Sequence, residues 1–109
     1  MRVLITGGAG FIGINAAKRL LAQKADLVLY DNLSRPGARH NLEDLRDCGR
    51  FELVESDVRD AETLETCVAQ RGPFDLVIHL AAQVAVTRSV ENPREDYEIN
   101  TLGTFNLLE

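Results

Sequence analysis

The stretch VLITGGAGFIGINAAKRL, residues 3–20, decides the fold of this 109-residue chain. In it, a short apolar run leads through a group of glycines into a helical pattern. Gly8, Gly10 and Gly13 fit the spacing G-x-G-x-x-G, and Gly7 with the last two fits G-x-x-G-x-x-G. An early glycine permits a tight turn, a middle one lets the backbone approach a pyrophosphate, and the last lets the helix pack closely on the strand. The amides of the first helical turn would then face the phosphates.

Strand-like and helix-like segments alternate along the rest of the chain. The strand-like runs are rich in Val, Ile and Leu and cover residues 2–6, 26–31, 51–55 and 75–80. Such near-continuous apolar runs are typical of parallel strands covered on both faces. The helical patterns between them show apolar stripes at Ile12, Ala16 and Leu20, at Leu42 and Leu45, and at Ala61, Leu64 and Val68. The order βαβαβαβα predicts an α/β sheet with helices on both faces.

Two helix starts carry capping signals. Asp60 is well placed to cap the helix that follows it. In ENPRED, Asn92 can cap, Pro93 fits the first helical position, and Glu95 completes a capping-box spacing. We expect this last helix to run without a break through residues 97–109.

An acidic residue at the end of the second apolar run supports a dinucleotide site. Asp31 lies 18 positions after Gly13, close to the expected spacing of about 20. A carboxylate there accepts from the adenosine ribose hydroxyls and repels a 2′-phosphate, which favours NAD over NADP. Arg35 weakens that inference, because a guanidinium could pair with such a phosphate. Asp57, after the third run, could accept from an adenine amino group or form a helix-entry turn. The alternative for the whole glycine motif is a tight turn that binds nothing.

Charge and composition limit the possible partners. The net charge of −5 argues against nucleic acid as the main partner. Residues 1–30 nevertheless hold four basic residues against one acidic, so the glycine-rich end suits an anion best. No apolar run approaches 18 residues and no export signal is visible, so we expect no membrane partner. Cys48 and Cys67 lack C-x-x-C spacing, which predicts half-buried reduced thiols in a cytoplasmic protein. No pattern predicts a metal site.

Five segments of the sequence carry a family resemblance. VLITGGAGFIG, YDNLSRPG, DVRD, HLAAQ and NTLGTFNLLE occur in this order. By them the chain resembles the N-terminal part of an extended short-chain dehydrogenase/reductase, and within that superfamily the NAD-dependent nucleotide-sugar epimerases and dehydratases. The resemblance covers essentially residues 1–109 and implies a Rossmann-type doubly wound parallel sheet of strand order 3-2-1-4. It also implies an incomplete NAD-binding domain, cut before the later strands and the sugar-binding region.

The resemblance implies NAD as the cofactor and gives residues a part in holding it, together with the four glycines. Phe11 and Ile12 would offer backbone N–H groups to the pyrophosphate, and Asp31 and Asn32 would hold the adenosine ribose. The other positions implied are Ser34 and Arg35 along the adenosine, Asp57 and Val58 around the adenine, Leu80, Ala81, Ala82 and Gln83 at the middle of the cofactor, and Asn100 near the surrounding loops.

The family's catalytic pair, Tyr-x-x-x-Lys, is absent from this chain. Tyr30 and Tyr97 are followed four positions later by Ser34 and Thr101. We therefore expect no catalytic residue here and no activity in the chain by itself. A full-length parent would oxidise and re-reduce a carbon of a nucleotide-sugar substrate. The alternatives are a free-standing dinucleotide-binding half-domain without chemistry, or a fragment too incomplete to bind.

Four further polar positions are open to two interpretations each. His79 ends the fourth apolar run, where a packed, hydrogen-bonded histidine is expected rather than an acid or base. Thr87 and Ser89 fall where the sugar side of a cleft would begin, but a helix-entry role is favoured. Asn100 lies on a small, partly polar helix face and could bridge loop backbone. The run at residues 76–80 would be an open apolar edge, so we expect a homo-oligomer.

Overall fold

The computed structural model describes residues 1–82 and 90–109 and shows one parallel sheet. Its order is β3-β2-β1-β4, as the resemblance implied. The strands are β1 Arg2–Thr6, β2 Asp26–Asp31, β3 Glu52–Glu55 and β4 Leu76–His79. Val3 pairs with Leu27 on one side and with Leu76 on the other, so β1 is central. β3 and β4 are shorter than the apolar runs that predicted them, since Phe51, Asp75 and Leu80 lie outside the strands.

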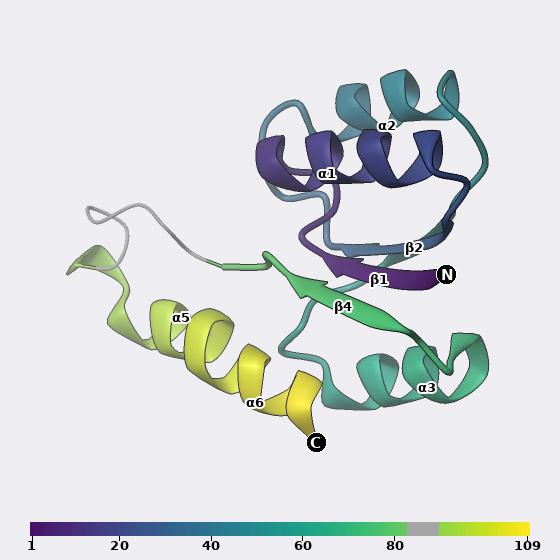
Figure 1. Ribbon diagram of the computed structural model, residues 1–109. Coiled ribbons are helices and arrows are strands. Elements are labelled where there is room, and N and C mark those ends of the chain that lie inside the picture. The colour runs from purple at the N-terminus through teal and green to yellow at the C-terminus, as the bar shows by residue number, and fades with distance from the viewer. Residues whose placement is uncertain (83–89) are drawn as a thin grey trace.

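Helices cover both faces of the sheet, which confirms the doubly wound α/β fold (Figure 1). One face carries α1 Phe11–Ala22 and α2 Ala38–Arg46. The other carries α3 Ala61–Arg71, α5 Pro93–Tyr97, the π-helical segment η1 Glu98–Leu102 and α6 Gly103–Leu108. Within the two described ranges, we find no helix with the length and apolarity that a bilayer crossing requires.

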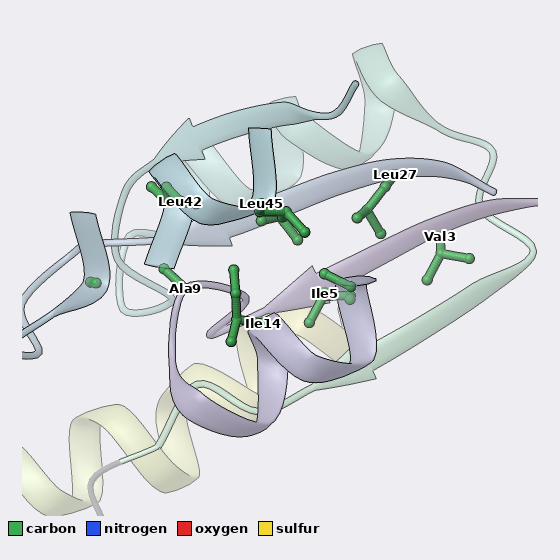
Figure 2. Packing of buried hydrophobic residues seen from close by; sticks show 10 residues of the cluster. Val3, Ile5, Ala9, Ile14, Leu27, Leu42 and Leu45 are labelled. Carbon is green, nitrogen blue, oxygen red and sulfur yellow. The ribbon is translucent and has the colours of Figure 1, made fainter. Parts of the chain in front are cut away.

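The two central strands, β1 and β2, are covered on both faces of the sheet. Val3 and Ile5 of β1 point to the side of α1 and α2, where they pack with Leu27, Leu42 and Leu45 (Figure 2). The opposite cluster contains the intervening strand residues Leu4, Val28 and Tyr30, with Val58, Leu64 and Cys67. This alternation follows from the two-residue period of a strand. The predicted burial is therefore confirmed for β1 and β2, whereas the residues of the outer strands β3 and β4 are partly buried or exposed.

The predicted apolar stripe of α1 is confirmed at Ala16 and Leu20, which are partly buried against the core, but is wrong at Ile12. The fully buried residues of the helix are Gly13, Ile14 and Ala17. Ile12 is 66% exposed. The reason is the glycine loop, against which Gly13 packs so closely that a Cβ there would lie 2.5 Å from the Gly7 carbonyl oxygen. That contact sets the rotation of the helix about its axis and turns Ile12 outward.

The stripe of α3 is also shifted. Leu64 and Cys67 are buried, whereas Ala61 and Val68 are exposed, so the buried pair follows i, i+3 spacing and not i, i+4. The two thiols differ from the expected half-buried state, because Cys67 is buried and Cys48 exposed. The predicted cap is present, since the Asp60 carboxylate accepts from the Thr63 N–H at 3.1 Å.

The last helix is capped as predicted but is not continuous. The Asn92 side chain accepts from the Glu95 N–H at 3.1 Å, and Pro93 occupies the first turn. The expected uninterrupted helix is wrong, because η1 widens to a π turn in which the Gly103 N–H bonds to the Glu98 carbonyl. Gly103 then packs on Val58, where an added Cβ would lie 2.6 Å from Val58 Cγ2.

Substitution of the two isoleucines of α1 tests which face of the helix is buried. Ile14→Ala should lower the free energy of unfolding by about 2–5 kcal/mol, because it leaves a cavity in the core. Ile12→Ala, the matched control on an exposed side chain, should change it by less than about 0.5 kcal/mol. Urea unfolding followed by circular dichroism measures both. Equal destabilisation by the two variants would contradict the burial pattern.

Candidate cofactor-binding site

A cleft of about 320 Å³ lies at the carboxyl ends of the strands, a volume within the range of small-molecule sites. The chain runs outward from β1 to β2 and β3 and then crosses back to β4 on the other side of β1, so the strand order reverses between β1 and β4, and open α/β sheets bind ligands at such points. Most residues predicted from the sequence line it. They are Gly7, Gly10, Phe11, Ile12, Gly13, Asp31, Asn32, Ser34, Arg35, Asp57, Val58, Leu80, Ala81 and Ala82.

Three predicted positions are not among those lining residues. Gly8 is buried beneath the loop, where an added Cβ would lie 2.6 Å from Leu29 Cδ2. Asn100 lies on η1, where its side-chain amide donates to Asp96 at 3.0 Å. It therefore interacts with a neighbouring turn of its own helix. Gln83 lies outside the described residues, as do Thr87 and Ser89.

Glycine is needed at the different positions of the loop for different structural reasons. Gly7 has a φ of +69°, and a Cβ there would lie 2.7 Å from the backbone of both Leu80 and Ala81. Gly7 and Gly13 are therefore required by the packing of the loop itself. Gly10 is different, because the one neighbour of an added Cβ is the Gly7 oxygen at 3.4 Å. The missing side chain of Gly10 leaves room on the cleft side.

The start of α1 has the geometry of an anion site. The first intrahelical bond runs from the Ile14 N–H to the Gly10 carbonyl at 2.8 Å, so the amides of Phe11, Ile12 and Gly13 precede it. Gly10 supplies no side-chain cap, and the first turn contains no acidic residue. The exposed amides and the helix dipole can thus meet a negatively charged group.

The Asp31 carboxylate ties the glycine loop to the end of β2. One oxygen accepts from the Ala9 N–H at 3.0 Å and the other from the Leu33 N–H at 2.7 Å. Each carboxylate oxygen has a second lone pair. Asp31 therefore holds the loop in place and can still accept a hydroxyl in the cleft.

Arg35 crosses the cleft rather than lying free in solvent. Its guanidinium donates to the Ala82 carbonyl at 3.1 Å and so joins the segment after β2 to the segment after β4. Asn32 also faces across strands, since its amide donates to Asp57 at 3.1 Å. The Asn32 side-chain oxygen accepts from the Ser34 N–H at 3.1 Å, which shapes the turn between them.

Asp57 forms the helix-entry turn that its sequence position allowed, and its side chain also lines the cleft. Its carboxylate accepts from the Arg59 backbone N–H at 2.9 Å, which forms the turn into α3. The same group lines the cleft and binds the Arg59 guanidinium at 2.7 Å. Hydrogen bonding to Arg59 lowers the pKa of Asp57 below its ordinary value of 3.8. Asp57 is thus a fixed anion at the adenine side of the predicted site.

Sequence reasoning missed three lining residues, Tyr30, Ser56 and Ile99. Tyr30 directly precedes Asp31, and its hydroxyl donates to the Asp57 carbonyl at 3.1 Å. Burial raises the pKa of Tyr30, so this hydroxyl remains a donor. The strand pattern already placed Tyr30 and Ser56 beside predicted residues. Ile99 had no such signal, because it faces the cleft from the π turn that the sequence did not predict.

Comparison with known proteins agrees with this geometry. A sequence profile of the family described as GDP-mannose 4,6 dehydratase matches residues 4–109. The chain belongs to this family. It is 49% identical over its whole length to CDP-paratose 2-epimerase of Salmonella typhi and 39% identical to dTDP-glucose 4,6-dehydratase 1 of Escherichia coli. These matches cover 32% and 30% of the two relatives.

A solved structure supports the family's fold. UDP-glucose 4-epimerase of Thermus thermophilus, crystallised in complex with NAD, superposes with a TM-score of 0.85 at 42% identity. The match covers 99% of this chain and 32% of the epimerase. The chain therefore spans about a third of the length of the family members that it resembles, and these include both epimerases and dehydratases.

Removing the Arg59 guanidinium should raise the pKa of the Asp57 carboxyl group. In Arg59→Met, the pKa of Asp57 should rise towards 3.8, because the main group that lowers it is gone. A depressed carboxyl pKa stabilises the fold above the unfolded-state pKa, and this contribution is lost as the pH falls through the folded-state pKa. The stability difference between wild type and variant should therefore narrow below about pH 4.

Carboxyl ¹³C NMR titration measures this pKa directly, and Arg39→Met is the matched control. Arg39 is exposed and pairs with Glu55 at 3.7 Å instead. An unchanged Asp57 titration in Arg59→Met would contradict the assignment.

Proposed function

We propose that this chain is the NAD(H)-binding portion of a nucleotide-sugar epimerase, most similar in kind to CDP-paratose 2-epimerase. One observation carries the proposal. The uncapped start of α1 and the Asp31 carboxylate face the same cleft at the carboxyl edge of the sheet. That pairing suits a diphosphate joined to a ribose. The 49% identity to CDP-paratose 2-epimerase supports the choice of relative over the UDP-glucose epimerases and the dTDP-glucose dehydratases.

The residues of the cleft would contact successive parts of the cofactor, from the pyrophosphate to the adenosine. The amides of Phe11 and Ile12 would bind the pyrophosphate, and Asp31 with Asn32 would accept from and donate to the ribose hydroxyls. The adenosine would lie along Ser34 and Arg35 and between Asp57 and Val58. Leu80, Ala81, Ala82 and Gln83 would lie along the middle of the cofactor, and Asn100 would support the surrounding loops. When bound, the nicotinamide supplies a reversible hydride acceptor for a sugar carbon.

The chain by itself should bind without catalysing. Its residues offer no Tyr-x-x-x-Lys pair to take the proton of a sugar hydroxyl. We therefore propose that residues 1–109 are the N-terminal part of a longer NAD-binding domain whose whole protein acts on a nucleotide-sugar. The missing pair equally favours a second candidate, a dinucleotide-binding half-domain without chemistry. The gene sequence beyond codon 109 distinguishes them, because only the first requires the pair downstream.

Calorimetric titration with NAD and NADP tests the binding function. We expect NAD to bind with a dissociation constant on the order of 1 mM. We expect NADP to bind more weakly, because Asp31 repels a 2′-phosphate. Asp31→Ala should weaken NAD binding and raise the affinity for NADP relative to NAD. The ratio of the NAD and NADP dissociation constants is the informative quantity, since loosening of the glycine loop would weaken the binding of both cofactors together.

Asp47→Ala is the matched control for this experiment. Asp47→Ala removes the same negative charge from an exposed residue, the C-cap of α2, which does not line the cleft. Its affinities should equal those of the wild type. NADP binding as tight as NAD binding by the wild type would rule out the proposed role of Asp31.

We also propose that this chain forms homo-oligomers through β4. In the described sheet β4 pairs with β1 alone, and Leu76 and Val77 are 42% and 43% exposed. An apolar open edge is a template for pairing with another strand. Sedimentation should therefore show concentration-dependent association, and Val77→Lys should shift it towards monomer. Leu108→Lys, on an exposed residue of α6, is the control, and a wild type that stays monomeric at high concentration would refute the proposal.

A further inference from the structure

His79, the last residue of β4, has partners on both ring nitrogens. Nδ1 lies 2.5 Å from Thr6 Oγ1 on β1, and Nε2 lies 2.9 Å from Thr104 Oγ1 on α6. The side chain is partly buried and is not among the residues that line the cleft. It therefore joins two elements on either side of β4.

The neighbouring hydrogen bonds fix the protonation of the ring. Thr6 Oγ1 accepts from the Ala81 N–H at 3.3 Å and shares the Leu80 N–H, at 3.1 Å, with the Thr6 carbonyl at 2.9 Å, so both lone pairs of the hydroxyl are engaged. Its own proton is thus donated to His79 Nδ1. Thr104 donates its proton to the Asn100 carbonyl at 2.7 Å, so its oxygen accepts from His79 Nε2. The pattern requires a neutral imidazole with its proton on Nε2.

These bonds run between two walls of the cleft. Leu80 and Ala81, whose amides Thr6 holds, line the cleft after β4. Thr104 donates to the Asn100 carbonyl. Asn100 directly follows Ile99, which lines the cleft from η1. We call Thr6, His79, Thr104 and the Asn100 carbonyl the His79 network. It is a continuous chain of polar contacts from one wall to the other.

We propose that neutral His79 is a positioning residue that holds the Leu80–Ala81 backbone and the π turn at a fixed separation, and that protonation of its ring releases them. The inference rests on the proposed function only in taking NAD as the ligand of the cleft. A proton on Nδ1 would point at Thr6 Oγ1, whose lone pairs are already occupied, so the bond that joins β1 to the ring would be lost.

Within residues 1–82 and 90–109, the hydrogen-bond partners of the His79 ring are Thr6 on β1 and Thr104 on α6, and neither carries a charge that would favour the imidazolium. Burial lowers the pKa of His79 below its ordinary value of 6.5. The network is therefore intact at neutral pH and is lost as the pH falls below that range.

The first test needs no ligand and no variant. In protein labelled with ¹⁵N-histidine, NMR should show His79 as the Nε2–H tautomer at pH 8. As the pH falls from 8 through the folded-state pKa of His79, which burial places below 6.5, the Ala81 amide and the Ile99 methyl signals should shift with the titration of His79. A neutral Nδ1–H tautomer would overturn the proposal. So would a His79 titration that leaves both of those signals unchanged.

The second test measures NAD affinity against pH. Wild-type affinity should fall about tenfold as His79 becomes protonated, whereas His79→Leu should bind about tenfold more weakly at pH 8 and show a flat profile. Thr104→Val breaks the same network from α6, so its effect should be non-additive with that of His79→Leu. His40→Leu, which removes an exposed histidine on α2, should keep the wild-type profile.

The outcomes separate the two proposals. NAD binding with the same pH dependence in wild type and His79→Leu would overturn the role of His79 and leave the proposed function standing. Absence of NAD binding at every pH would refute the proposed function, while the ligand-free titration would still decide the role of His79. If His79→Leu does not fold, Thr104→Val and the wild-type titration give the same decision.

Discussion

The contact between the Gly7 carbonyl and the Cα of Gly13 is the constraint from which the site follows. A Cβ on residue 13 would lie 2.5 Å from that oxygen, so only glycine lets α1 approach the end of β1 this closely. The approach fixes the rotation of α1, which buries Ile14 and exposes the backbone at Phe11 and Ile12. The anion-facing helix start is thus a consequence of packing.

Asp31 shows how one side chain can serve the fold and the cleft together. Its two bonds to the Ala9 and Leu33 amides are made without any ligand, so the carboxylate is already oriented when a ligand arrives. A ligand that needs this acceptor loses little entropy in ordering it. The cost is that Asp31 cannot be altered without loosening the glycine loop.

Local rules predicted the strands and the glycine loop, because those depend on spacing along the chain, whereas the strand order came from the family resemblance. Prediction failed where packing between elements decides the outcome. Ile12 fits a helical stripe, yet the loop contact at Gly13 turns it outward. The π turn depends on Gly103 meeting Val58, which lies 45 positions earlier, and so Ile99 could not be assigned to the cleft.

The two sides of the cleft differ in the range of the contacts that build them. On the side of β2 and β3, some carboxylates bond to backbone two positions away, as Asp31 does with Leu33 and Asp57 with Arg59, while Asp31 with Ala9 and Asn32 with Asp57 span 22 and 25 positions. On the side of β4, Thr6 bonds to amides more than 70 positions away, and His79 reaches Thr104 across 25. Contacts of long range form only with the complete sheet and are lost together. Destabilisation of the sheet should therefore loosen the long-range contacts on both sides of the cleft, while the two-residue turns at Leu33 and Arg59 keep their local geometry.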